Sequence, residues 1–140
     1  MTLTEALSPY DRPFAVPPGI VHVLDLPAPP GINNLWRSNR SRVHKSDSYQ
    51  RWLMQADAAA VMTGKVRSRK TIPGPFEAHI RIVRSATRAD LDAFTKALFD
   101  WAQSRGFVAN DKHCVRYTVE WHQGKLMPNT CRMVLTSLGE

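Results

Sequence analysis

The chain has 140 residues and a formal net charge of +7 at neutral pH, with 19 lysines and arginines against 12 acidic residues. This length fits one domain with a buried core, and the charge favours a polyanionic partner, either nucleic acid or an anionic membrane surface. No run of about 18 apolar residues occurs, which excludes a membrane-spanning helix, and the N-terminus lacks the pattern of a signal peptide. We therefore expect a cytoplasmic protein.

Residues 1–20 contain four prolines and no sustained hydrophobic periodicity, so they are predicted to form an extension outside the core. Two interpretations are open for this extension: poor order, or packing across a partner subunit. A single domain then spans residues 21–140. Apolar residues between Val21 and Leu26 predict its first strand, which ends at Pro27 and the prolines that follow.

The segment from Trp36 to Arg51 is rich in basic and short polar side chains and contains a single acid, Asp47. Such side chains donate hydrogen bonds to phosphate oxygens, so the segment is predicted to be a DNA-contacting loop. A solvated loop on a basic protein is the alternative. Trp36 has two open roles, stacking on a base or packing in a core or subunit interface. The basic residues assigned to DNA contact here are Arg37, Arg40, Arg42 and Lys45.

Ser46 or Ser48 is predicted to cap a helix that continues through Val61 and ends near Gly64. Its apolar face is wide and rich in alanine, which suits close packing. A second basic cluster without any acid follows and is predicted to track a DNA backbone, with a flexible connector as the alternative. The cluster comprises Lys65, Arg67, Arg69 and Lys70.

Apolar and polar residues alternate over residues 75–84, which predicts a strand with His79 on its outward or dimer-facing side. This strand leads to two arginines, Arg84 and Arg88, that directly precede a group of acids. Arginine forks match phosphate geometry, so we expect both arginines to hold a DNA strand near those acids.

The longest amphipathic pattern in the chain follows, with apolar residues at steps of three and four from Leu91 to Ala102. This spacing predicts a helix with one face turned toward a core. The helix is expected to end near Arg105 and Gly106, because glycine readily takes the left-handed conformation found at helix C-termini.

Three carboxylates and a lysine accompany this helix, and we predict that its N-terminus faces a turn that supplies the third acid. Clustered carboxylates raise one another's pKa unless a cation is present. Magnesium commonly takes one or two carboxylates together with waters and phosphate oxygens, so the acids are predicted to bind Mg²⁺, with Mn²⁺ as the alternative ion. The lysine would offset charge on a phosphate or orient a water. The predicted catalytic residues are Asp90, Asp92, Lys96 and Asp111.

Each of these residues also has a purely structural interpretation. Asp90 suits a helix N-cap, and Asp111 after an asparagine suits a turn. Asp92 and Lys96, four residues apart, suit an exposed ion pair worth ~0.3–0.5 kcal/mol. The metal-site prediction therefore depends on the four residues together.

Two further strands are predicted, over residues 113–122 and 130–138, and we expect them to pair as a hairpin. Strict alternation along the first of them places Cys114 and Glu120 on the side opposite Tyr117. For Glu120, a place in the metal site and a polar outward position are both open.

Together these elements predict an α+β fold, a small mixed sheet of about four strands with two main helices packed on it. The two cysteines, Cys114 and Cys131, both fall in predicted strands and are expected to be small buried thiols.

Several short motifs occur in a fixed order between residue 23 and the C-terminus. They are Leu26-Pro27, Pro29-Pro30, Asn33-Asn34, Arg88-Ala89-Asp90-Leu91-Asp92, Lys96, Leu98-Phe99-Asp100, Gly106-Phe107 and Asn110-Asp111. In this order and spacing they resemble the core of the RusA family of Holliday-junction resolvases. The resemblance implies a RusA-like fold and a homodimeric, magnesium-dependent endonuclease that cuts branched DNA by paired nicks.

Carried over by position, the resemblance implies that the three acids are the metal ligands and that Lys96 assists. The chain departs from the family pattern at two places. Ala93 stands where an asparagine typically follows the second acid, and Asn110 stands where an aspartate often precedes the last one.

The sequence therefore predicts a hydrolase that resolves four-way DNA junctions, with branched DNA and a second copy of the chain as partners and no membrane. One alternative is a non-catalytic protein that binds branched DNA but has lost metal competence. It predicts salt-sensitive binding without a magnesium-dependent product. The other alternative is a small interaction module with incidental charge, which predicts no preference for branched DNA.

Overall fold

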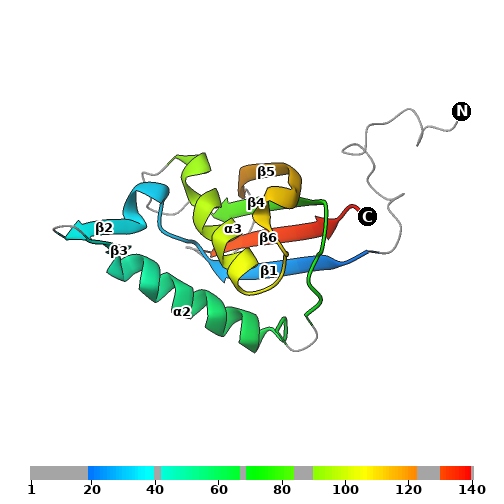
Figure 1. The fold of residues 1–140 in the computed structure, drawn as a ribbon, viewed down its shortest axis with the longest axis horizontal. Coiled ribbons are helices and arrows are strands. Elements are labelled where there is room, and N and C mark those ends of the chain that lie inside the picture. Colours follow the sequence, from blue (N-terminus) through cyan, green and yellow to red (C-terminus); the bar gives the residue numbers. More distant parts are fainter. Residues whose placement is uncertain (1–18, 40–41, 67–68, 84–89, 123–129, 140) are drawn as a thin grey trace, which may run out of the picture.

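The structure, a computed structural model, describes residues 19–39, 42–66, 69–83, 90–122 and 130–139. Its central element is a four-stranded sheet with the order β1, β6, β4, β5 (Figure 1). Strands β4 and β5 run parallel, whereas β6 is antiparallel to both β1 and β4. The strands are β1 (Val21–Pro27), β4 (Phe76–Val83), β5 (Cys114–His122) and β6 (Thr130–Ser137).

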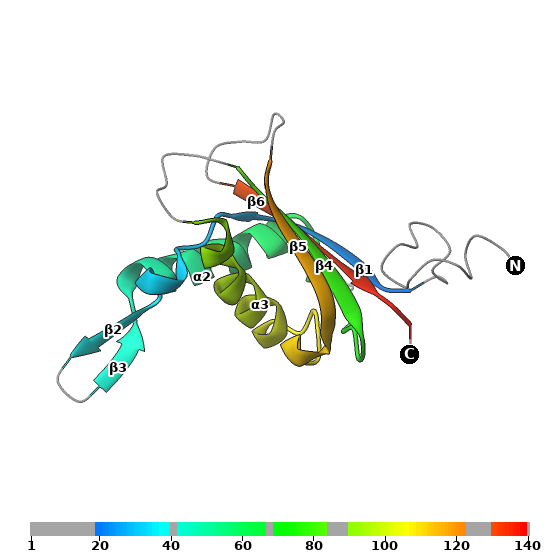
Figure 2. The ribbon, with the colours of Figure 1, turned by 90° about the horizontal axis from the view of Figure 1, so that it is seen from above.

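Two helices, α2 (Asp47–Met62) and α3 (Thr95–Ser104), lie on one face of this sheet (Figure 2). The predicted α+β fold, a mixed sheet of four strands with two helices packed on it, is thereby confirmed. Within the described ranges, no helix is long and apolar enough to cross a membrane. In the described residues, short 3-10 helices connect the larger elements, namely η2 (Ile32–Asn34), η3 (Leu91–Phe94) and η4 (Asp111–His113).

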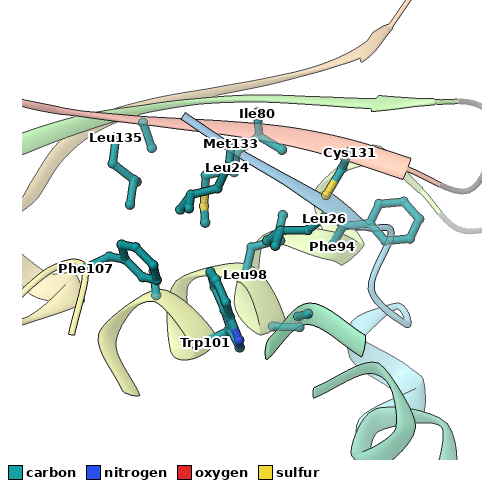
Figure 3. Packing of buried hydrophobic residues seen from close by; sticks show 14 of the residues in the cluster. Leu24, Leu26, Ile80, Phe94, Leu98, Trp101, Phe107, Cys131, Met133 and Leu135 are labelled. Carbon is teal, nitrogen blue, oxygen red and sulfur yellow. The ribbon is translucent and has the colours of Figure 1, made fainter. Parts of the chain in front are cut away.

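The core fills the space between the sheet and the helices (Figure 3). Leu98 of α3 faces the inner side chains of the sheet, whereas Trp101 lies against Phe107 and against Trp52 of α2, and both Leu98 and Trp101 are at most 1% exposed. Each large apolar side chain buried in this way contributes roughly 1.5–3 kcal/mol. The Trp101 indole also donates a hydrogen bond of 2.9 Å to Asp57 of α2, which ties the two helices together.

Three of the four helix ends agree with the sequence prediction, but α3 begins at Thr95 because Leu91–Phe94, expected to be its first turn, form the 3-10 helix η3. Ser46 is the N-cap of α2, and its hydroxyl accepts a 3.1 Å hydrogen bond from the Tyr49 N–H. The chain leaves α2 at Gly64 and α3 at Gly106, with φ values of 74° and 80°. Positive φ values of this kind favour glycine, which has no Cβ to clash.

The predicted pairing of the last two strands is wrong. β6 lies between β1 and β4, while β5 pairs only with β4 at the edge of the sheet. The physical reason is burial. The inner side chains of β6 are fully buried and need neighbours on both sides, whereas four successive residues of β5 from Val115 to Thr118 are exposed.

The predicted alternation along β5 also fails at its first residues. Phe76 of β4 pairs with Cys114, but the next residue, Glu77, pairs with Arg116, so Val115 is an extra residue at this irregularity. An extra residue shifts the alternation by one position. Cys114 therefore packs toward the core, on the same side as Tyr117, whose ring meets Phe99 of α3.

The basic segment predicted to be a loop is a β-hairpin, so that prediction is wrong. Strands β2 (Trp36–Asn39) and β3 (Arg42–Lys45) form a separate two-stranded sheet that projects away from the main sheet (Figures 1 and 2). All four residues of β3 are exposed. Because this hairpin buries no apolar side against the core, its sequence lacks the alternation that predicts strands.

Of the predicted extension, residues 1–18 lie outside the described residues. Ile20 is already part of the domain, because its carbonyl accepts a 2.9 Å hydrogen bond from the Ser137 N–H and its side chain packs against the core.

Candidate active site

Lys96 lies on the exposed side of α3. Its ammonium donates a 3.0 Å hydrogen bond to the carboxylate of Asp100, one helical turn toward the C-terminus. The interpretation of Asp92 and Lys96 as an ion pair is therefore wrong. The side chains of Lys96 and Asp100 are 52% and 32% exposed, so the pair is accessible to a ligand.

Asp111 begins η4, and η4 is attached to the last turn of α3. The Asp111 N–H donates a 2.8 Å hydrogen bond to the side chain of Gln103. The Asn110 side chain in turn accepts a 2.9 Å hydrogen bond from the Lys112 N–H. Asn110 is thus the N-cap of η4, and an aspartate in its place would accept the same bond. The departure at Asn110 therefore has a local structural role.

Two carboxylates raise the pKa of Lys96 above its usual value. The hydrogen bond from Lys96 to Asp100 has the largest effect, followed by the charge of Asp100, while the charge of Asp111 contributes less. Lys96 is accordingly protonated at neutral pH. It can donate hydrogen bonds to an anion, but it is unsuited to act as a general base.

Asp90 and Asp92 flank the other end of the helix. Asp90 is the N-cap residue of η3 by position, and its carbonyl accepts a 3.0 Å hydrogen bond from the Ala93 N–H. Its side chain makes no capping bond, so the N-cap interpretation is wrong for the carboxylate. Both carboxylates are exposed, and neither forms an ion pair with another described residue.

The three predicted acids are not gathered at one point. Asp111 is attached to Gln103 near the end of α3, whereas Asp90 and Asp92 precede its first residue. The helix has ten residues and is therefore about 15 Å long. In the part of the chain that the structure describes, no three His, Cys, Asp or Glu residues are grouped closely enough to hold a metal ion.

The donor chemistry nevertheless suits magnesium, because the predicted ligands are all carboxylate oxygens. Mg²⁺ retains several waters and often uses only one or two protein carboxylates, with substrate phosphates completing its coordination. Asp111, with Lys96 and Asp100 nearby, supplies such a carboxylate at a half-buried position of η4. These residues fit a magnesium ion bound mainly through water and substrate.

The predicted DNA-contacting residues fall into two groups. Arg37, Arg42 and Lys45 are exposed on the β2–β3 hairpin. Arg69 and Lys70 lie beyond the end of α2, where the Arg69 guanidinium covers the Phe107 ring at 5.7 Å and the Lys70 carbonyl bonds to His22. The remaining predicted residues, Arg40, Arg67, Arg84 and Arg88, lie outside the described residues.

The outward position of Glu120 is confirmed. It accepts hydrogen bonds of 2.8 Å from both His79 and Arg81 on the sheet face opposite α2 and α3. The bonds from His79 and Arg81 lower the pKa of the Glu120 carboxyl. These side chains line a hollow of about 470 Å³, separated by the sheet from Lys96 and Asp111.

Sequence reasoning did not assign a site role to Asp100 or Gln103. The i,i+4 spacing of Lys96 and Asp100 was available as a signal, since such pairs meet on one helix face. Gln103 gave no comparable signal, because its bond to the Asp111 N–H depends on how the chain turns after α3.

The sequence matches no protein-family model and no curated protein.

Proposed function

We propose that this protein is a magnesium-dependent, structure-selective DNA endonuclease that resolves four-way junctions by paired nicks, as in the RusA family. The observation that carries the proposal is the arrangement of the exposed Lys96 with the half-buried Asp100 and Asp111. A protonated lysine beside carboxylates on a strongly basic protein suits a phosphodiester substrate.

The residues at α3 and η4 have distinct roles in this proposal. Lys96 donates to a non-bridging oxygen of the scissile phosphate and offsets the charge that develops there. Asp100 is a positioning residue, because its hydrogen bond sets the direction of the ammonium. Gln103 fixes the backbone of Asp111, whose charge acts on the lysine.

Asp111, beside Lys96 and Asp100, would bind the magnesium ion, directly or through its waters, whereas Asp90 and Asp92 lie at the other end of α3 and do not reach the same ion. A bound Mg²⁺ polarises the phosphodiester and lowers the pKa of a coordinated water. Asp90 and Asp92 lie before the start of α3, and Asp111 lies beyond its end. We therefore infer that the acids at the two ends of the helix act differently on the phosphate.

A homodimer suits this substrate. Two-fold related subunits present two equivalent sites, and a four-way junction offers two equivalent strands to be nicked. The net charge of +7 supplies attraction to the DNA backbone that does not depend on sequence.

The test is cleavage of a synthetic four-way junction, with a linear duplex of the same arms as the control, in magnesium and in EDTA. We expect paired nicks on the junction in magnesium only. Tight junction binding without cutting in magnesium or manganese would contradict the nuclease function and support a protein that only binds branched DNA. Equal affinity for junction and duplex without cutting would contradict both functions.

A further inference from the structure

The β2–β3 hairpin has two chemically different faces. Its register pairs Trp36 with Lys45, Arg37 with His44, and Ser38 with Val43, and directly paired residues of an antiparallel ribbon share a face. One face, here called the arginine face, carries Arg37, Arg42 and His44. The other, the tryptophan face, carries Trp36, Ser38, Val43 and Lys45.

The tryptophan face fixes the hairpin to the domain. The Trp36 ring meets Tyr49 of α2 edge to face, with 6.0 Å between ring centroids, and the Lys45 ammonium lies 5.6 Å from the centre of the Trp36 ring. Trp36 remains 46% exposed, so it packs at the base of the hairpin without entering the core. Of the two roles open for this residue, the packing role is the one the contacts support.

Backbone and side-chain hydrogen bonds hold the same base in place. The Ser46 N–H donates to the Leu35 carbonyl at 2.8 Å, and the buried Ser46 hydroxyl donates to the Asn34 carbonyl at 2.6 Å. The Gln50 side chain donates to the Lys45 carbonyl at 3.0 Å. The hairpin is therefore a projecting arm whose direction is set by α2.

The arginine face is free to bind. Arg37, Arg42 and His44 are exposed, and the one side-chain hydrogen bond among them in the described residues joins Arg37 to the neighbouring Trp36 carbonyl. No acid occurs between residues 36 and 46. Like charges on one ribbon face are destabilising unless a counter-charge is present. This face consequently favours a polyanion.

The size of the arm fits the major groove of DNA better than the minor groove. Two strands of four residues extend roughly 13 Å at ~3.3 Å per residue. The major groove of B-DNA is about 12 Å wide and admits a two-stranded ribbon, whereas the minor groove is only about 6 Å wide. Arginine forks also match the O6 and N7 acceptors of guanine, which lie in the major groove.

We propose that the β2–β3 arm enters the major groove of a duplex arm of the substrate, with Arg37 and Arg42 directed at guanine edges. This inference rests on the proposed DNA substrate, but it does not depend on cleavage. The sequence predicts that this segment contacts phosphates, whereas in this arrangement it contacts bases. The protein would then prefer particular base sequences in addition to the four-way structure.

The test is dimethyl sulfate footprinting of the protein on a four-way junction in EDTA, which requires binding alone. The reagent methylates guanine N7 in the major groove and adenine N3 in the minor groove. We expect the wild-type chain to protect guanine N7 positions in one arm. The Arg37→Ser/Arg42→Ser variant should lose that protection and bind roughly thirtyfold more weakly or worse, since it removes two arginine–guanine pairs, each worth about 1–3 kcal/mol.

The matched control is Arg81→Ser/Arg132→Ser, which removes the same charge from the exposed sheet face opposite α2 and α3. It should retain the footprint. Unchanged guanine protection in the arm variant would overturn the inference, and so would protection of adenine N3 in place of guanine N7. A chain that binds and footprints but never cuts would overturn the nuclease proposal alone. The absence of any DNA binding would overturn both.

Discussion

The ammonium of Lys96 bonds to Asp100, one turn ahead of it on α3, and not to Asp92, one turn behind. This choice orients the lysine toward η4 and Asp111, whose charge also acts on it. The carboxylate of Asp92 is left without an ion-pair partner among the described residues.

Lys96→Ala should reduce junction cleavage by about 10²-fold or more, because removing one donor to developing charge typically has an effect of that size. Stability should change by less than about 1 kcal/mol, since the pair is exposed. Single-turnover cleavage and urea unfolding measure the two effects. Asp100→Asn is the matched control, because it keeps an acceptor for the ammonium and should lose less than about tenfold. Near-normal cleavage by Lys96→Ala would show that the lysine forms a surface ion pair and has no role in catalysis.

Asp111→Asn should abolish magnesium-dependent cleavage, whereas Asp90→Asn and Asp92→Asn, at the other end of α3, should reduce it less, and junction affinity of all three variants should stay within about threefold of wild type. The amide keeps the shape of the side chain but is a poorer ligand for a hard cation. Cleavage and gel-shift assays on the same junction separate the two properties. If a variant retains wild-type cleavage, the substituted residue is not a metal ligand.

Asp57→Asn should destabilise the protein by about 1 kcal/mol at neutral pH. Asp57 accepts bonds from Arg105 and Trp101, and the bond from Arg105 is the main reason that its pKa is lowered below 3.8. A lowered folded-state pKa stabilises the protein above the unfolded-state pKa and ceases to do so as pH falls through the folded-state value.

The difference in unfolding free energy between wild type and Asp57→Asn should therefore be constant from about pH 5 to 7 and shrink below about pH 4. Urea unfolding at several pH values measures it. A difference that does not vary down to pH 3 would show that the charge of Asp57 is not the source of the stabilisation.

Gly106→Ala should destabilise the protein more than Gly64→Ala does. Both glycines have positive φ, which costs an alanine about 1 kcal/mol. A Cβ on Gly64 meets open space, but one on Gly106 would lie 3.3 Å from the Arg69 side chain and disturb its position over Phe107. Urea unfolding measures the loss of unfolding free energy in each variant. Equal losses would mean that the Arg69 side chain moves away from the new Cβ at no cost in stability.

Cys131 should resist alkylation in the folded protein. Burial raises the pKa of its thiol to about 12, and the residue is 1% exposed. The reactive thiolate is therefore almost absent at pH 8. Iodoacetamide labelling followed by mass spectrometry should detect modified Cys131 only in urea. Stoichiometric labelling of the native chain would contradict its burial.

The elements predicted from the sequence are those with strong local signals. Both main helices have apolar residues at helical spacing, a serine cap or a terminal glycine, and their ends were predicted correctly at Ser46, Gly64 and Gly106. The strand containing Phe76 was predicted from its alternation. In each case, local chemistry and burial in the final fold favour the same conformation.

The failures concern relationships between distant residues. Strand β6 pairs with β1 across more than a hundred residues, which no local pattern in either strand specifies. The extra residue at Val115 adjusts β5 to β4 and is equally non-local. In the candidate site, the lysine was predicted, but its partner Asp100 was not, because Asp92 offered the same helical spacing.

The position of β6 has a consequence for biosynthesis. The strand synthesised last among the described elements occupies the interior of the sheet, between β1 and β4, which leave the ribosome much earlier. Until β6 emerges, β1 and β4 lack their shared neighbour and expose unpaired backbone edges, which are prone to aggregate. The nascent chain must therefore delay assembly of its sheet, and we expect ribosome-associated chaperones to bind it during that interval.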